Sequence, residues 1–84
     1  MVETRIAPRH RVAKPAIIEH RGGKYPCTVR DISSTGAALE FSDLVSQVMR
    51  LVPEKVTLVI PEDKLRLSCR VAWHRNYRMG VAFD

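Results

Sequence analysis

Apolar and polar side chains alternate with a period of two along most of this chain. The clearest run covers residues 64–74, and shorter runs of the same kind begin at Cys27, Ala37, Val56 and Met79. Because successive side chains of a β-strand point to opposite faces of a sheet, each run predicts a strand with one buried face. Alternation of this kind is typical of antiparallel sheets, so the sequence predicts an all-β fold.

Turn-forming residues separate the predicted strands, at 21–24, 33–36, 61–64 and 74–77. With residues 12–19 as the first strand, the chain is expected to have six. Six short strands in one small domain predict a closed six-stranded antiparallel barrel, because closure removes exposed strand edges. Residues 42–51 are the exception to the alternation, because their apolar residues recur at helical spacing. They predict one short helix, capped by Ser42 or Asp43 and ended by Pro53. We expect this helix to cover one mouth of the barrel.

The chain of 84 residues has room for one domain. Residues 1–11 are polar and basic, and Pro8 disfavours a helix at the residue before it. We therefore expect a flexible basic N-terminal arm over 1–11 and the barrel domain over 12–84. The last predicted strand runs to the end of the sequence, so we expect no fused output domain.

The charge balance favours an anionic partner. Lys and Arg number 14 against 9 Asp and Glu, which gives a net charge of +5, and ten of the 14 are Arg. Arginine binds phosphate and carboxylate through two parallel hydrogen bonds. A basic balance is also common in small domains that bind no anion, so charge alone leaves both interpretations open.

The cysteines and the apolar segments exclude several classes of protein. Cys27 and Cys69 are the only cysteines, and both fall on predicted inward faces, so we expect reduced core thiols and no metal site. The first residues carry no apolar stretch of the signal-peptide kind, and no later segment is apolar enough to span a bilayer, so we expect a cytoplasmic protein. No set of nucleophile, base and orienting group is visible, and no enzymatic activity is expected.

The basic arm carries two arginines with a spacing that suits a nucleotide. In an extended segment Arg5 and Arg9 lie on the same side, about 13 Å apart. Guanidinium groups can chelate phosphate, bind guanine O6 and N7 or stack on a base. Arg11, two residues further on, could share the face of Arg9 as a secondary contact. The alternative is a solvated tail without a specific partner.

A second motif, Asp31-x-Ser33-x-x-Gly36, follows the second predicted strand. Asp31 and Ser33 are two residues apart, so both side chains should point the same way. A carboxylate would repel phosphate, so Asp31 is expected to accept hydrogen bonds from the N1–H and N2–H edge of guanine, with the Ser33 hydroxyl adding another contact. Gly36 is expected to supply a positive φ for a tight turn. The alternative is that these are ordinary turn residues.

Taken in this order, Arg5-x-x-x-Arg9 and Asp31-x-Ser33-x-x-Gly36 resemble the PilZ domain family, and the likeness extends to the closing stretch 69–83. The resemblance implies a six-stranded split barrel that is a bacterial receptor for cyclic di-GMP. It also implies that Arg5 and Arg9 clamp the ligand while Asp31, Ser33 and Gly36 form a rigid wall. Thr4 stands where many members have another arginine, which leaves open whether one ligand or a stacked pair is bound. We expect no C-terminal helix of the kind that some members have.

We therefore expect a cyclic di-GMP receptor that orders its arm on binding and signals to a protein partner, without a cofactor and without membrane insertion. Two alternatives remain. One is a barrel of the same fold that binds no nucleotide and serves as a protein-interaction module. The other is a basic barrel that binds single-stranded nucleic acid, which the small number of aromatics and the inward register of Trp73 and Phe83 disfavour. Trp73 itself is expected in the core, with stacking on a base as its alternative role.

Overall fold

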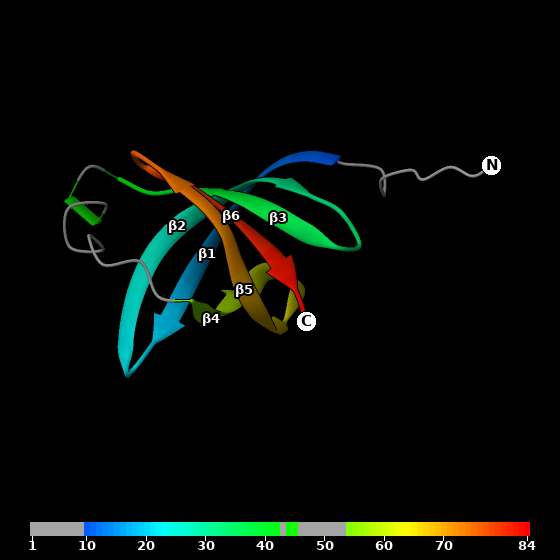
Figure 1. Ribbon diagram of the computed structural model, residues 1–84. Helices are drawn as coiled ribbons and strands as arrows, with labels where there is room; N and C mark the ends of the chain where they lie inside the picture. The colour runs from blue at the N-terminus through cyan, green and yellow to red at the C-terminus, as the bar shows by residue number, and fades with distance from the viewer. Residues whose placement is uncertain (1–9, 43, 46–53) are drawn as a thin grey trace.

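The computed structural model describes residues 10–42, 44–45 and 54–84, which form a closed antiparallel barrel (Figure 1). The prediction of an all-β barrel with six strands is confirmed. The strands are β1 (His10–His20), β2 (Gly23–Ile32), β3 (Gly36–Glu40), β4 (Lys55–Ile60), β5 (Leu65–Arg75) and β6 (Arg78–Phe83).

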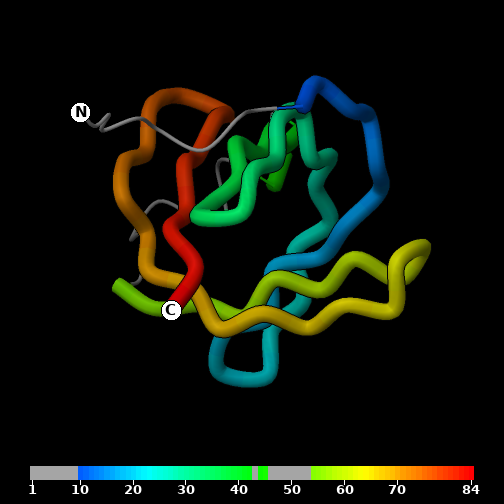
Figure 2. Tube along the Cα trace, turned by 90° about the vertical axis from the view of Figure 1, so that its right-hand side faces the viewer, coloured from blue at the N-terminus to red at the C-terminus, as the bar shows by residue number. Residues whose placement is uncertain are grey.

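The order of the strands around the barrel is β1-β2-β3-β6-β5-β4. Four neighbouring pairs are hairpins of consecutive strands, whereas β3–β6 and β1–β4 join segments far apart in the sequence. The closing β1–β4 pair is short, and it matches residues 17–19 of β1 with 57–59 of β4. Figure 2 shows the resulting ring of strands. The β3–β6 pair matters most for function, because it brings the β2–β3 turn beside the last strand.

The core fills the inside of the barrel with apolar side chains from all six strands. Its buried members are Ala16, Ile18, Cys27, Val29, Leu39, Phe41, Val56, Leu58, Ile60, Cys69, Met79 and Val81. The alternation predicted nearly all of these positions, including both cysteines, which are free thiols. Among the described residues no charged or polar side chain is buried. The described part of the barrel interior is therefore an apolar core.

Tight turns connect the hairpins where the sequence predicts them. Arg21 and Gly22 join β1 to β2 with φ values of 51° and 81°, a pair of left-handed residues that matches the twist of a hairpin. A 3₁₀ turn, η1 (Pro61–Asp63), ends at the left-handed Lys64 before β5. Asn76, at φ 53°, turns β5 into β6. Left-handed backbone thus occurs at three non-glycine residues of the described chain.

The first strand begins earlier than expected. β1 starts at His10, so the last two residues of the predicted arm, His10 and Arg11, are paired strand residues. The rest of the arm, including Arg5 and Arg9, lies outside the described residues. Of the predicted helix over 42–51, only Ser42, Leu44 and Val45 are described. The backbone N–H of Val45 donates to Ser42 Oγ at 3.2 Å, which is the hydrogen bond of an N-cap.

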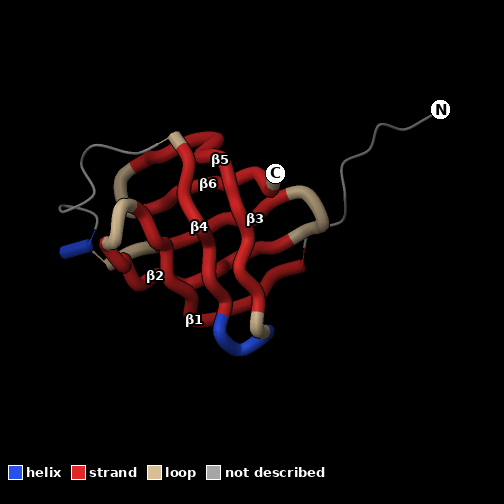
Figure 3. Tube along the Cα trace, turned by 90° about the horizontal axis from the view of Figure 1, so that it is seen from below, coloured by secondary structure: helices blue, strands red, loops and turns tan. Residues whose placement is uncertain are grey.

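Two ion pairs brace the outside of the barrel. Lys14 Nζ on β1 lies 2.7 Å from Asp63 Oδ2 of η1, and Arg66 Nη2 on β5 lies 2.6 Å from Glu19 Oε1 on β1, across β4. The hydrogen bond from Arg66 lowers the pKa of Glu19. Both pairs are solvent-exposed, so each stabilises the fold only modestly. Figure 3 shows that strands dominate the described chain, and no helix in this part is long and apolar enough to cross a membrane.

Candidate functional site

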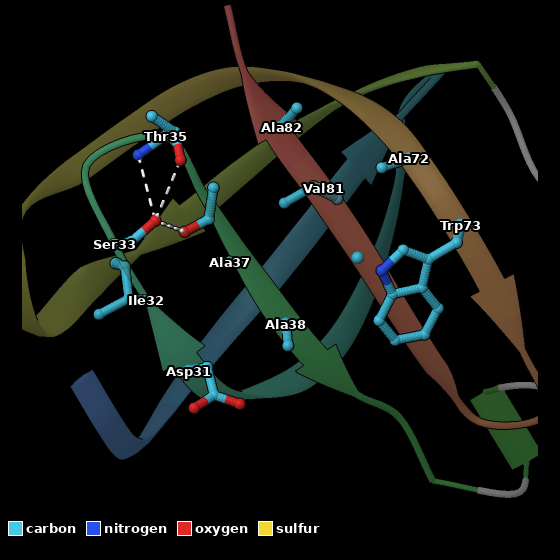
Figure 4. Close-up of a pocket in the computed structure, with 12 residues that line it drawn as sticks. Asp31, Ile32, Ser33, Thr35, Ala37, Ala38, Ala72, Trp73, Val81 and Ala82 are labelled. Atoms are coloured by element: carbon cyan, nitrogen blue, oxygen red, sulfur yellow. Dashed lines mark hydrogen bonds between the residues drawn. The ribbon is translucent and has the colours of Figure 1, made fainter. Parts of the chain in front are cut away.

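A shallow pocket of about 220 Å³ lies on the outer face of the barrel, over β3 and β6. Asp31, Ser33 and Thr35, from the end of β2 and the β2–β3 turn, line one side, and Trp73 of β5 lines another. Figure 4 shows the Asp31 carboxylate and the Trp73 indole on opposite sides of the two central strands. A carboxylate, hydroxyls and an aromatic ring thus face one hollow from three segments of the chain.

The floor of the pocket is made of residues with almost no side chain. In the β3–β6 register Gly36 lies opposite Ala82, and Ala38 lies opposite Gly80. These two successive outward-facing pairs carry nothing larger than a methyl group. A sheet surface without long side chains lets a flat ligand lie close to the backbone. The sequence analysis missed this floor, because it appears only once the β3–β6 register is known.

A bulge turns Asp31 outward. Strict alternation along β2 places Asp31 on the same face as the buried Cys27 and Val29. In the β2–β3 register, however, Val29 pairs with Leu39 and Asp31 pairs with Ala38, so Arg30 is an extra residue. The inserted residue moves Asp31 to the outer face, where it lines the pocket together with Ser33. No described residue forms an ion pair or hydrogen bond with the Asp31 carboxylate, which leaves its oxygens available to a donor.

A second bulge does the same for Trp73, and it corrects the prediction that this residue is in the core. Val71 pairs with Val81 and Trp73 pairs with Gly80, so Ala72 is the extra residue of β5. Trp73 is consequently 48% exposed. Its indole covers Gly80, because a Cβ built there would lie 2.1 Å from Trp73 Nε1. The exposed tryptophan also weakens the case against a nucleic-acid-binding barrel, which rested in part on an inward register of Trp73 and Phe83; Phe83 does pack against the core.

Ser33 holds the β2–β3 turn together. Its Oγ accepts a hydrogen bond from the Thr35 N–H at 3.2 Å, and its own N–H donates to the Gly36 carbonyl at 2.9 Å. The Ser33 and Thr35 hydroxyls lie 3.2 Å apart (Figure 4). The side chain therefore has a structural role in the turn, in addition to its position on the pocket rim. The turn presents two hydroxyls rather than the one expected from the sequence.

Gly36 is required for a different reason from the one predicted. Among the described glycines only Gly22 has a positive φ, so the expectation of a left-handed Gly36 is wrong. Instead, a Cβ at Gly36 would lie 2.4 Å from the Val81 carbonyl oxygen on the neighbouring strand. Glycine is needed here because β3 and β6 approach closely, which also flattens the floor of the pocket.

A comparison with protein-family models matches the PilZ domain over residues 3–84, essentially the whole chain. This chain belongs to the PilZ domain family. Members are generally receptors for cyclic di-GMP and act as binding modules rather than as enzymes. In a comparison with curated proteins, none matched the chain. The resemblance in the sequence motifs is thereby confirmed at the level of the family.

The arginines of this PilZ domain are placed only in part. Arg11 is exposed on β1 and lies directly opposite Asp31 in the β1–β2 register, so it borders the acidic wall without lining the pocket. Arg5 and Arg9 lie outside the described residues. Because β1 begins beside Asp31, the chain segment that carries both arginines starts at the edge of the pocket. Arg11 is thus a described arginine that lies next to the site.

The other reactive side chains of the described residues form neither a metal site nor a nucleophilic one. Within the described residues no three His, Cys, Asp or Glu side chains gather in a way that could hold a metal ion. Burial raises the pKa of the Cys27 thiol to about 12 and raises that of Cys69 as well. Both thiols are therefore protonated at neutral pH and poorly nucleophilic.

Proposed function

We propose that this PilZ domain is a receptor for cyclic di-GMP, with the outer pocket as the rigid half of its binding site. The observation that carries the proposal is the pairing of the Asp31 carboxylate, which no described residue binds, with the exposed Trp73 indole across a floor of glycine and alanine. This arrangement offers a planar purine both a hydrogen-bond acceptor and an aromatic contact. We also propose that the protein is located in the cytoplasm.

The chemistry of the ligand orients it in the pocket. The N1–H and N2–H groups of guanine are donors that a carboxylate such as Asp31 accepts, whereas the phosphates would be repelled by it. A base placed against Asp31 can lie over the methyl-sized floor and meet the Trp73 ring, as aromatic side chains do with nucleobases. The phosphates would then lie on the side of β1, where the chain is basic.

The size of the pocket indicates that it needs a second half. Its volume of about 220 Å³ is smaller than the roughly 300 Å³ at which ordinary ligand sites begin. A doubly charged dinucleotide would therefore protrude from it. Arg5 and Arg9, on the segment that precedes β1, are the residues we assign to the protruding phosphates and second base. Ordering of that segment around the ligand is the conformational change that a protein partner would detect.

Calorimetric titration with cyclic di-GMP tests the proposal. We expect Arg9→Ala and Arg5→Ala each to weaken binding at least about tenfold, since each removes a bidentate, charged contact. Arg21→Asn is the matched control, because it also removes one positive charge but lies in the turn at the far end of β2. Unchanged affinity in both arm variants would refute the assignment of the arm.

The role of Asp31 is tested by specificity. We expect Asp31→Ala to reduce the preference for cyclic di-GMP over cyclic di-AMP while leaving residual binding of both, because phosphate contacts do not depend on the carboxylate. Cyclic di-AMP is the suitable comparison because adenine lacks the N1–H and N2–H donors. A preference that survives in Asp31→Ala would show that another group recognises guanine.

Because Trp73 is exposed, single-stranded nucleic acid has to be tested as an alternative ligand. Thermal melting with cyclic di-GMP, with a short single-stranded RNA and with neither separates the alternatives, because a ligand specific to the native state raises the midpoint. We expect a rise with cyclic di-GMP alone. A rise only with RNA would favour the nucleic-acid-binding barrel, and no rise with either would favour a barrel that binds no nucleotide.

A further inference from the structure

The β5–β6 hairpin ends in a surface that carries two arginines and a tyrosine, whose side chains form no ion pair or hydrogen bond with a described residue. Arg75 and Arg78 flank the turn and lie directly opposite each other in the register, so both point to the outer face. Tyr77, in the turn, is 40% exposed. We call Leu44, Arg75, Tyr77 and Arg78 the tip patch. It is separate from the pocket, although Trp73 lies between the two.

Leu44 belongs to this surface because the chain after β3 is tied to the hairpin. The Phe41 N–H donates to the Tyr77 carbonyl at 2.7 Å, and Figure 1 shows the chain leaving β3 beside the β5–β6 turn. Leu44 follows three residues later, within about 10 Å of chain. It is 75% exposed, the highest value among the large apolar side chains described. An exposed aliphatic side chain thus follows closely after the Phe41 backbone that is hydrogen-bonded to the hairpin.

The arginine pair is electrostatically unfavourable in the free protein. Like charges directly opposite on neighbouring strands repel, and neither Arg75 nor Arg78 forms an ion pair with a described residue. Glu40 is a described carboxylate that lies opposite Arg78 in the β3–β6 register. Its Oε1 is 3.4 Å from Arg30 Nε, so this acid already has a cationic neighbour. These three arginines thus stand against one glutamate, so the combined charge of the four described residues is positive.

We propose that the tip patch is a docking surface for a protein partner, and that the docking segment is acidic and carries an apolar side chain. Carboxylates of the segment would bind the Arg75–Arg78 pair and relieve its repulsion. Leucine or phenylalanine of the segment would pack on Leu44 and Tyr77. Arginine and tyrosine are the residue types that contribute most to protein interfaces, which fits an exposed cluster of both.

The composition of the patch favours protein over nucleic acid. Barrels that bind single strands combine a long basic groove with several stacking aromatics. Here the two arginines of the tip patch have Glu40 beside them, and the most exposed large apolar side chain among the described residues is the aliphatic Leu44. The proposal concerns a surface other than the nucleotide pocket, so it holds whether or not the domain binds cyclic di-GMP.

The test is a titration of the isotope-labelled 84-residue chain, without nucleotide, followed by amide chemical shifts. The probe is a short synthetic peptide in which glutamate and aspartate flank one leucine and one phenylalanine. Parallel titrations use the same peptide with lysine in place of the acids, and a short oligouridylate. We expect shifts centred on the tip patch with the acidic peptide only. Shifts centred elsewhere, or none at the patch, would overturn the proposal, and shifts there with oligouridylate alone would assign the surface to nucleic acid.

A charge-matched pair of variants completes the test. The double variant Arg75→Gln/Arg78→Gln removes two positive charges at the tip patch. The control variant Arg21→Asn/Lys24→Gln removes two positive charges at the β1–β2 turn. All four residues are exposed, so both variants should fold, which thermal melting checks. We expect at least about tenfold weaker peptide binding in the first variant and little change in the second. Equal weakening in both would show that only net charge matters and would refute a local docking surface.

Discussion

Two positions of the pocket require glycine because of different neighbours, and single substitutions test this difference. A Cβ at Gly80 would meet the Trp73 indole, whereas a Cβ at Gly36 would meet the Val81 backbone carbonyl. An exposed side chain can move away, but a paired strand cannot. We therefore expect Gly80→Ala to cost about 1 kcal/mol of unfolding free energy and Gly36→Ala at least about 2 kcal/mol. Chemical denaturation measures both.

The same pair of variants reports on the pocket. Trp73 is the only tryptophan of the chain, so its fluorescence follows the indole without interference. We expect Gly80→Ala to shift the emission to longer wavelength as the indole leaves the floor, and to weaken cyclic di-GMP binding. An unchanged emission spectrum in Gly80→Ala would show that the indole does not lie over Gly80 in solution.

The buried thiol of Cys27 makes stability depend on alkaline pH. Burial raises its pKa from 9.0 to about 12. The unfolded chain therefore loses this proton first as pH rises, and the folded chain keeps it. The stabilisation is complete below pH 9 and is lost as pH approaches 12. We expect the free energy of unfolding to fall over this range, and to fall less steeply in Cys27→Ala. Parallel slopes in the two proteins would contradict the assignment.

Asp31 and Trp73, the two side chains that matter most to the site, face the opposite way from the one that alternation in the sequence predicts. Alternation predicted the burial of Val29 and Cys69 correctly, because each lies before a bulge. Asp31 and Trp73 lie after one, so both face opposite to the simple pattern. A bulge depends on the partner strand, and nothing in the sequence of β2 or β5 alone indicates that Arg30 and Ala72 are the extra residues.

At the scale of elements, the β1–β2 hairpin has a turn that could be improved. Arg21 adopts φ 51° and is followed by Gly22 at φ 81°. Left-handed backbone is unfavourable for arginine and well tolerated by asparagine, and Asn-Gly is the preferred pair for a two-residue turn of this type. We expect Arg21→Asn to raise the free energy of unfolding by about 0.5–1 kcal/mol. Denaturation of Arg21→Asn alongside Arg21→Ala checks this, and equal stability of the two would contradict the role of backbone conformation.

The strands themselves could be predicted well because each follows a local pattern. All four hairpin turns lie near Gly, Pro, Asn or Asp, whose backbone preferences act within a few residues. The start of β1 could not be predicted, because His10 and Arg11 are polar and join the sheet through pairing with Ile32 and Asp31. Their strand structure depends on a partner about twenty residues away in the sequence.

At the scale of the whole molecule, the site depends on pairings that local patterns do not contain. The β3–β6 register places Gly36 and Ala38 beside Ala82 and Gly80, and it assembles the pocket floor from segments more than forty residues apart. Six strands of this length predicted a barrel, but not which strand would lie beside β3. The acidic motif and the family resemblance identified one wall of the pocket, whereas the floor and the tip patch required the structure.

The nearness of the pocket and the tip patch predicts negative coupling between their ligands, if both proposals hold. Trp73 lies opposite Gly80 in the pocket and two residues from Arg75 in the patch. A dianionic nucleotide in the pocket would partly neutralise the positive field that attracts an acidic segment. We expect saturating cyclic di-GMP to weaken binding of the acidic peptide about fivefold, the lower end of usual coupling, and the peptide to weaken nucleotide binding by the same factor.

Reciprocal titrations measure this coupling, and salt separates its causes. Because the coupling is electrostatic and acts near the surface, it should shrink as ionic strength rises and the Debye length falls below about 10 Å. Steric competition for Trp73 would persist at high salt, so coupling that is independent of salt would assign the effect to shared contacts instead. Nucleotide binding that leaves peptide affinity unchanged at low salt would show that the two surfaces are independent.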